Sequence, residues 1–269
     1  MMRTKEAINL FLKSRQAKGL SLQTLRWYKG ILDAFVRQHD KLPRKPEAIE
    51  DFISSCTAGD ERRHGYYRAI RTLYRFLQKR YGKSNPVDKF EPPKRTKKIP
   101  LALTPDQLDQ LLRFPHQPKI KVALLFLADT GCRIGELSNL KPEDLSQTPW
   151  GYLAKVRGKT GERLVPISPE VYHGLLKYLP LPYSPFRLRR LVSQAFHNAH
   201  VPGSAHTLRH TFGTLWQGDE LVLQVIMGHA YLSTTKIYRH LRTQTLSEQQ
   251  HKYSPLRMVM SMSKEMNML

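Results

Sequence analysis

Apolar residues recur at helical spacing through residues 1–90. Ser21 is well placed as an N-cap, and behind it Leu25, Tyr28 and Leu32 fall on one helical face. Other helices are predicted near residues 4–18, shortly after Pro46 and near 62–81. We therefore expect the first part of the chain to be an all-helical domain.

The segment near 62–81 carries two stripes at helical spacing. One is apolar and comprises Tyr66, Ala69, Ile70, Leu73 and Leu77. The other is basic and comprises Arg68, Arg71, Arg75 and Lys79. A row of cations is ordinarily a solvated face, but it is also the pattern of a surface that follows phosphates. Almost no acidic residue interrupts the sequence from 62 to 87, which keeps the second alternative open.

The helical pattern ends in residues 82–100, where four prolines argue against a continuous helix. Lys94, Arg95, Lys97 and Lys98 cluster between these prolines. We expect residues 91–100 to form an extended basic linker between two domains.

A second domain is predicted to begin at Thr104-Pro105, an N-cap followed by a first-turn proline. The only clear β signal is a hairpin near 151–168. Helices are predicted near 104–114, 118–130, 169–178, 185–199, 206–217, 220–227 and 233–242. The predicted fold class is therefore mostly α with a small β-hairpin or sheet, in a two-domain architecture.

The charge is strongly one-sided, with 44 Lys and Arg against 22 Asp and Glu and a net charge of +22. Residues 1–100 alone contain 24 basic and 10 acidic residues. This excess is typical of proteins that bind nucleic acid or another anionic surface. The sequence shows no run of 18 apolar residues and no signal-peptide pattern, so we expect no membrane span. Two cysteines, Cys56 and Cys132, cannot build a disulfide framework, which fits a reducing cytoplasm.

Candidate chemistry is concentrated between His206 and Tyr238. His206, Arg209 and His210 share one helical face, because their spacing is i, i+3 and i+4. His229 follows Gly228, which is predicted to end a helix, and Ser233 offers an N-cap one to two turns before Tyr238. Taken singly, each of these residues is compatible with an ordinary structural role.

A metal site is one alternative, because His206 and His210 have the spacing of a zinc-binding helix. HTLRH lacks the glutamate of the zinc-protease motif, and it places the permanent cation Arg209 between the two histidines. We therefore expect no metal.

Two further residues lie upstream. Arg133 begins a helical run in TGCRIGELSNL, and Lys159 lies in the turn of VRGKTGERLVPI. The ordered set of Arg133, Lys159, His206, Arg209, His229 and Tyr238 resembles the active site of the tyrosine recombinases, the phage-integrase and Xer family. The resemblance covers nearly the whole chain and is strongest over residues 101–242. It implies a SAM-like core-binding domain at 1–90 and a catalytic domain at 101–242.

The resemblance also implies roles. Tyr238 would attack phosphorus and form a 3′-phosphotyrosine, while Lys159 would protonate the leaving 5′-oxygen. His206 would assist proton transfer, and His229 would hydrogen-bond the phosphate.

Two arginines of the set, Arg133 and Arg209, would give paired donors to the phosphate oxygens. Such a cluster performs the charge neutralisation that metal ions provide in two-metal nucleases, so no cofactor is expected. Glu136, three residues after Arg133, would orient rather than act as a base. Cys132 is interpreted as a small packed residue.

Two departures from the family pattern stand out. The interval from Arg209 to His229 is about three residues shorter than usual in the family. The hairpin turn has Gly161 where the family often has a second lysine, and we expect Arg163 to supply that charge.

The partners implied are double-stranded DNA recombination sites and three further copies of the chain in a tetramer. Residues 243–253 are polar and are predicted to be a tether within the tail at 243–269. Leu256, Met258, Val259 and Met260 then offer an apolar surface near 255–262 that we expect to dock in trans on a neighbouring protomer.

Two other functions are compatible with parts of this pattern. A strand-nicking topoisomerase or hairpin-telomere resolvase could use the same residues, but the compact two-domain layout argues against it. A non-catalytic DNA-binding protein could keep the same fold, but the intact set of six residues argues against that.

Overall fold

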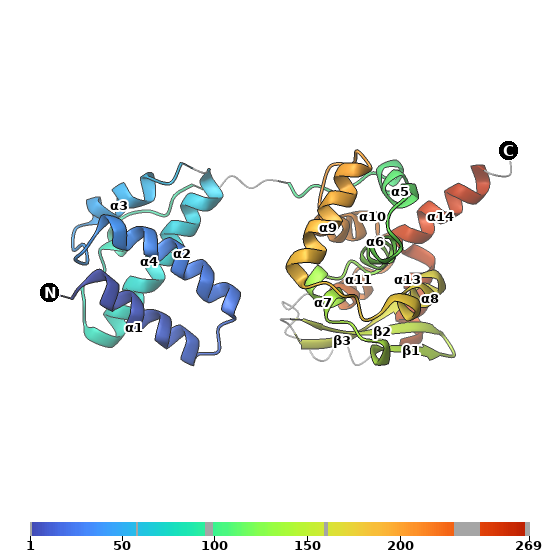
Figure 1. Cartoon of the computed structure of the whole chain (residues 1–269), viewed down its shortest axis with the longest axis horizontal. Coiled ribbons are helices and arrows are strands. Elements are labelled where there is room, and N and C mark those ends of the chain that lie inside the picture. The colour runs from blue at the N-terminus through green and yellow to red at the C-terminus, as the bar shows by residue number, and fades with distance from the viewer. Residues whose placement is uncertain (1, 58, 95–98, 159–160, 229–242, 267–269) are drawn as a thin grey trace. The chain divides into compact units, whose positions relative to one another are not determined.

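The computed structural model describes residues 2–57, 59–94, 99–158, 161–228 and 243–266, and side chains as far as Ser261 (Figure 1). It divides into two compact units, Met1–Lys98 and Ile99–Leu269. Both are dominated by helices, and the second also contains a three-stranded antiparallel sheet, which confirms the predicted fold class. Among the described residues, no helix is long and apolar enough to cross a membrane.

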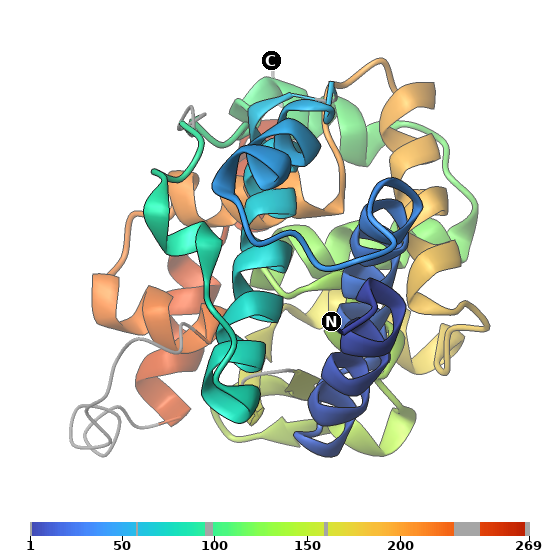
Figure 2. The same ribbon diagram turned by 90° about the vertical axis from the view of Figure 1, so that its left-hand side faces the viewer.

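The N-terminal unit is built around its longest helix, α4, which runs the length of the unit in Figure 2. Helix α4 packs against every other element of the unit. The elements are α1 (Thr4–Ala17), α2 (Leu22–Gln38), α3 (Pro46–Ser54), α4 (Asp60–Tyr81) and the short 3-10 helix η1 (Pro86–Lys89). The hydroxyl of Ser21 accepts a hydrogen bond from the backbone N–H of Thr24, so the predicted N-cap is confirmed.

The two stripes of α4 face in different directions. The apolar stripe faces the core, where Ala69, Ile70, Leu73 and Leu77 are fully buried and Tyr66 is partly buried. In the basic stripe Arg68, Arg75 and Lys79 are exposed and Arg71 is half-buried. The Arg68 guanidinium lies 5.5 Å from the ring centroid of Trp27, so its stem is braced on the surface while its charge remains accessible.

The C-terminal unit contains the remaining elements, with the sheet along one side (Figure 1). They are α5 (Pro105–Arg113), α6 (Pro118–Thr130), α7 (Ile134–Ser138), η2 (Pro142–Asp144), β1 (Leu145–Thr148), β2 (Gly151–Gly158), β3 (Gly161–Ile167), α8 (Pro169–Tyr178), α9 (Pro185–Asn198), α10 (Ala205–Leu215), α11 (Glu220–Met227), α13 (Thr243–Tyr253) and α14 (Pro255–Met266). The helix predicted near 233–242 lies outside the described residues.

Helix α6 is the centre of this unit. Its sequence is apolar on nearly all sides, as expected of a helix that is buried all round, and it packs against α7, α8, α9, α10, α14 and β3. It ends at Gly131, which adopts the left-handed conformation with φ 60°. A Cβ atom at Gly131 would lie 2.7 Å from Cδ1 of Phe212, so glycine is required here by both conformation and space. This tight turn delivers the chain into Cys132 and Arg133.

The sheet has the order β1-β2-β3, and all pairs are antiparallel. The predicted hairpin is confirmed as β2 and β3, with Val156 paired to Arg163 and Gly158 paired to Gly161. Strand β1 was not predicted. Its sequence LSQT has only Leu145 to pack on the core, so the alternation that marks a half-buried strand is absent.

The prediction of a polar tether at 243–253 is wrong, because these residues form helix α13. Its buried face carries polar side chains whose partner is distant in sequence. The carboxylate oxygen Oδ1 of the fully buried Asp129 accepts hydrogen bonds from Gln250 Nε2 at 2.7 Å and from Ser254 Oγ at 2.6 Å. Its other oxygen accepts one from the backbone N–H of Ser168 at 2.7 Å. Composition alone could not reveal that these polar residues are satisfied inside the protein.

The apolar residues that follow also pack within the same chain. Leu256 and Val259 of α14 are almost completely buried in the core that α5, α6 and α10 help to form. The surface that was expected to dock in trans therefore docks in cis in this structure. The physical reason is that Asp129 holds Ser254 at the start of α14, which brings these side chains onto their own domain.

Substitution of Ser254 by alanine should destabilise the protein. The change leaves a buried carboxylate oxygen with one donor fewer, and the loss of such a bond costs about 1–3 kcal/mol of unfolding free energy. Urea unfolding of the full chain measures the effect. Ser261→Ala is the control, because that hydroxyl is exposed and donates to the carbonyl of Met258 within its own helix. Equal stability of the two variants would show that the Asp129 cluster does not hold the tail.

Candidate active site

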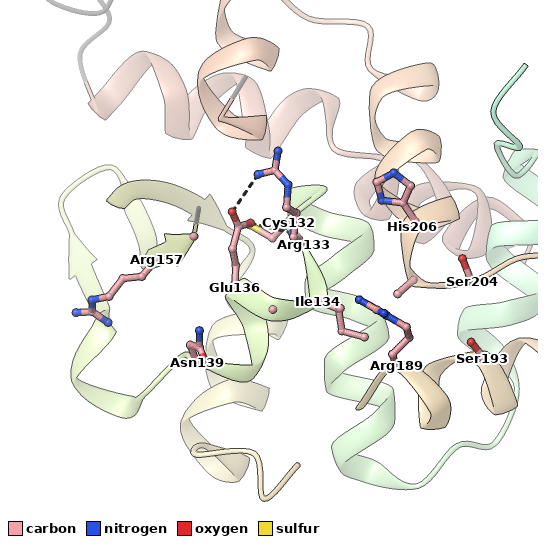
Figure 3. A pocket seen from close by; sticks show the side chains of 13 residues that line it. Cys132, Arg133, Ile134, Glu136, Asn139, Arg157, Arg189, Ser193, Ser204 and His206 are labelled. Atoms are coloured by element: carbon pink, nitrogen blue, oxygen red, sulfur yellow. Dashed lines mark hydrogen bonds and ion pairs between the residues drawn. The ribbon is translucent and has the colours of Figure 1, made fainter. Parts of the chain in front are cut away.

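A pocket of about 830 Å³ opens between the α6–α7 turn, the end of β2 and the helices α9 and α10 (Figure 3). Three arginines and one histidine line it: Arg133, Arg157, Arg189 and His206. The acidic residue in its lining is Glu136, and that carboxylate is already paired. The pocket is thus suited to an anion.

Arg133 is the N-cap of α7 and follows directly on the Gly131 turn. Its backbone N–H donates to Oε2 of Glu136 at 2.8 Å, and its Nη1 donates to Oε1 at 3.2 Å. The side chain is nevertheless 39% exposed, so a guanidinium held on one side presents its other side to the pocket. The prediction that Arg133 begins a helical run is confirmed.

Glu136 lies beneath Arg133 with a side chain only 1% exposed. Its second partner is Arg163 on β3, whose Nη1 and Nη2 donate to the two carboxylate oxygens at 2.8 and 3.0 Å. Burial alone would raise the pKa of Glu136, but hydrogen bonds from Arg163 and from the Arg133 backbone outweigh it and hold the pKa below its usual range. The carboxylate is therefore ionised at neutral pH, in a position to orient Arg133.

Arg209 lies on α10 and is 5% exposed. Its Nη1 donates to the carbonyl of Gly131 at 2.7 Å and its Nη2 to the carbonyl of Met227 at 2.9 Å. Burial, with repulsion from Arg133, lowers the pKa of Arg209 to about 10, so it remains charged at neutral pH. It thus joins the ends of α6 and α11, and these two bonds use only part of its five donors.

His206 begins the same helix as Arg209 and lies exposed at the pocket, with its ring centroid 4.6 Å from that of His210. Desolvation lowers the pKa of His206, and repulsion from His210, Arg209, Arg133 and Arg189 lowers it further. A neutral imidazole at neutral pH can accept a proton. Within the described ranges, no group of three or more His, Cys, Asp and Glu side chains is arranged to hold a metal ion.

The structure brings Arg133, Glu136, His206 and Arg209 together from positions up to 76 residues apart in sequence. Lys159, His229 and Tyr238 lie outside the described residues, as do Arg95, Lys97 and Lys98 of the linker. Lys94 is exposed.

Arg163 does not supply a second charge to the hairpin turn. It lies two residues inside β3 and is 12% exposed, and its charge is used by Glu136. The two-residue period of a strand places Arg163 on the same face as the fully buried Val165, and this signal could have revealed its inward direction.

Cys132 is buried, as predicted. Its sulfur accepts a hydrogen bond from Arg163 Nη2 at 3.5 Å. Burial raises the pKa of its thiol to about 11, so it stays protonated and is not a nucleophile at neutral pH.

Arg189 was also missed. It lies on α9, and its guanidinium points to the pocket near His206 (Figure 3). The cluster of arginines at 187, 189 and 190 gave the only signal, and it does not distinguish which of the three faces inward.

No family model matches the chain. It is 32% identical to the tyrosine recombinase XerC of Thermodesulfovibrio yellowstonii, in an alignment that covers 89% of this chain and 92% of that protein. It is 30% identical to the tyrosine recombinase XerA of Pyrococcus horikoshii, with 87% and 88% covered.

Solved structures share the fold. One structure of lambda integrase (residues 75–356) bound to DNA has a TM-score of 0.71 at 17% identity, with 91% of this chain and 96% of that chain covered. A second structure, a dimer of the same fragment bound to a core site, has a TM-score of 0.69. The XerH recombinase bound to its difH substrate has a TM-score of 0.62 at 22% identity, with 92% and 84% covered. At these identities the likeness concerns the fold.

Substitution of Arg189 by glutamine should raise the pKa of His206. The change removes one of the cations that repel the imidazolium, so protonation becomes easier. An NMR titration of the His206 ring measures this. Arg187→Gln is the control, because the Arg187 guanidinium instead lies 5.8 Å from the ring centroid of Tyr183. An unchanged His206 titration in the Arg189 variant would show that the pocket cations do not set its pKa.

Proposed function

This chain belongs to the tyrosine recombinase family and is a tyrosine-type site-specific DNA recombinase, and from that premise we propose that it works through a covalent 3′-phosphotyrosine. The observation that carries the proposal is the pocket lined by Arg133 and His206, with Arg209 buried next to it and bonded to the carbonyl of Gly131. It is a cationic cavity whose acidic lining residue, Glu136, is already neutralised by two arginines. Such a cavity suits a phosphodiester, whose transition state carries more negative charge than its ground state.

In the proposed reaction the Tyr238 oxygen attacks the scissile phosphorus. A bond forms between tyrosine oxygen and phosphorus as the bond from phosphorus to the 5′-oxygen breaks. The tyrosine loses its proton, which His206 helps to transfer, and Lys159 gives a proton to the departing 5′-oxygen. A free 5′-hydroxyl of another strand then reverses the step. The energy of the phosphodiester is kept in the covalent intermediate, so ATP is not needed.

Charge stabilisation in this proposal comes from arginines. Arg133 is fixed by Glu136 and Arg209 by two backbone carbonyls, so both guanidinium groups are held before DNA arrives. Donors fixed in advance stabilise a developing charge without the cost of reorganisation. We propose that His229 adds a further hydrogen bond to the phosphate and that neither a metal nor another cofactor takes part.

For DNA binding we propose two further cationic regions. One is the basic stripe of α4, where Arg68, Arg75 and Lys79 are exposed. The other is the linker cluster of Lys94, Arg95, Lys97 and Lys98. Both would contact phosphates and would therefore add affinity without sequence preference.

We propose that the active assembly is a tetramer on DNA. Support comes from the shared fold with lambda integrase, of which one solved structure is a tetramer bound to a Holliday junction. If α14 is exchanged between protomers, Leu256 and Val259 must leave the core of their own chain and make the same contacts on a neighbour, as in domain swapping.

Substitution of Tyr238 by phenylalanine should abolish the covalent intermediate and leave DNA binding intact, because only the nucleophilic oxygen is lost. Nicked DNA carrying the recombination site would trap the adduct, and denaturing gel electrophoresis would detect it. The wild-type adduct should form equally well in EDTA. A denaturation-resistant adduct in the Tyr238→Phe variant would eliminate this tyrosine as the nucleophile. Recombinant products, rather than relaxed circles, would separate recombination from topoisomerase activity.

Substitution of Arg68, Arg75 and Lys79 by glutamine should weaken binding to all DNA sequences. Each phosphate contact that is lost should reduce the slope of log affinity against log salt by about 0.9. Fluorescence anisotropy at several salt concentrations measures the slope. Three exposed cations elsewhere in the N-terminal unit, Arg37, Lys45 and Lys83, provide a variant of equal net charge. An equal change of slope in both variants would assign the effect to net charge rather than to the face of α4.

A further inference from the structure

We propose that Arg163 is a positioning residue of the active site, and that its buried ion pair with Glu136 sets the geometry of three segments that carry proposed catalytic residues. This inference rests on the proposed function and deepens it. The three segments begin at Arg133, at Gly158 immediately before Lys159, and at Gly228 immediately before His229.

The Arg163 guanidinium connects two of these segments directly and the third through Glu136. Arg163 holds both oxygens of Glu136 on α7 through Nη1 and Nη2, at 2.8 and 3.0 Å. Its remaining nitrogen, Nε, donates to the carbonyl of Ile226 near the end of α11 at 2.8 Å. The side chain thus ties β3 to α7 and to α11 at once. Glu136 in turn holds Arg133 through its backbone N–H and its Nη1.

At two glycines the backbone lies in close contact with the Arg163–Glu136 pair. A Cβ atom at Gly158 would lie 2.5 Å from Oε1 of Glu136. A Cβ atom at Gly228, whose φ is +63°, would lie 3.0 Å from Cζ of Arg163. Each glycine therefore lets its backbone approach one member of the pair more closely than any other residue could. In the sequence Lys159 follows the first glycine and His229 follows the second.

The end of α11 is held by two arginines together. Arg163 donates a hydrogen bond to the carbonyl of Ile226, and Arg209 donates one to the next carbonyl, that of Met227. Carbonyls in the last turn of a helix lack partners within the helix and carry partial negative charge, so both bonds are favourable. Arg209 also bonds the carbonyl of Gly131, two residues before Arg133. The network is therefore continuous from the Gly131 turn to Gly228.

Stability alone does not explain why an ion pair is used here. A buried ion pair adds little to the free energy of unfolding compared with apolar side chains of the same volume, because both charges lose their water. What the bidentate pair adds is a fixed direction and distance between two planar groups. Lysine would keep the charge but could not bond both Glu136 oxygens and the Ile226 carbonyl in one plane.

The test is Arg163→Lys in the full-length protein. Cleavage of nicked DNA under single turnover gives a rate constant and an amplitude, measured well below the unfolding temperature. We expect the rate constant for adduct formation to fall about 10- to 100-fold, with the amplitude and the DNA affinity within about threefold of wild type. A merely structural role would lower the amplitude, because fewer molecules would be folded, and would leave the rate constant of the folded fraction unchanged.

The matched control is Arg257→Lys. Arg257 forms a bidentate pair with Glu170 at 3.2 to 3.3 Å in the same unit, outside the pocket lining. Its rate constant should equal that of wild type. A wild-type rate constant for Arg163→Lys would overturn the inference. Absence of an adduct with the wild-type protein would instead count against the proposed function.

A second variant, Gly158→Ala, tests the positioning by the Arg163–Glu136 pair without removing a charge. The added methyl group must displace Glu136 or the end of β2, so cleavage should slow. Replacing the scissile 5′-oxygen by sulfur provides a specific readout, because a thiolate departs without needing a proton. If the pair positions Lys159 through Gly158, the defect of Gly158→Ala should shrink on the sulfur substrate. A defect of equal size on both substrates would show that Gly158 does not act through the proton donor.

Discussion

The turn at the end of α6 is the constraint on which the rest of the C-terminal unit depends. Within five residues it contains Asp129, Gly131 and Arg133, and each holds a different part of the chain. Asp129 is fully buried and needs donors, which it obtains from β3–α8 and from the tail. The carbonyl of Gly131 accepts from Arg209, and Arg133 is fixed by Glu136. Since a buried polar group without a partner costs free energy, these contacts must all form together. The site is therefore assembled by the same interactions that complete the fold.

Buried carboxylates have an unusual importance in a chain with a net charge of +22. Asp129, Glu136 and Asp144 are each less than 5% exposed. Glu136 and Asp144 are paired with arginines, Asp144 through Arg157 at 2.7 Å. Such pairs restrict the arginine side chains and neutralise the carboxylates that are buried beside the pocket. Arg163 is largely buried by its pair, whereas Arg133 and Arg157 are paired and still 39% exposed, so these two both organise the protein and present charge at the pocket.

Most helices could be predicted, because their periodicity, N-caps and prolines are local signals. Thr104-Pro105 and Ser21 cap helices as the sequence indicates. Strand β1 could not be predicted, because a strand of four mostly polar residues is specified by its pairing with β2 rather than by its own pattern. Helix α13 was missed for a related reason. Gln250 and Ser254 are polar but buried, because both bond to Asp129. The sequence could not show this, since Asp129 lies more than 120 residues away.

The site residues also divide into those that local sequence signals predict and those whose partners are distant in sequence. Residue types and their order predicted Arg133, His206 and Arg209 as site residues, through the resemblance to the tyrosine recombinases. The prediction that Arg163 supplies charge to the hairpin turn is wrong. The sequence shows an arginine near that turn, but it does not show that Glu136 pairs with it. The structure places that arginine against Gly228, with its Nε bonded to the carbonyl of Ile226 near the end of α11. A guanidinium that bonds in three directions can position these segments only if none of its bonding partners moves independently. Arg209 contributes to that condition, because its bonds to the carbonyls of Met227 and Gly131 restrain the end of α11 as well.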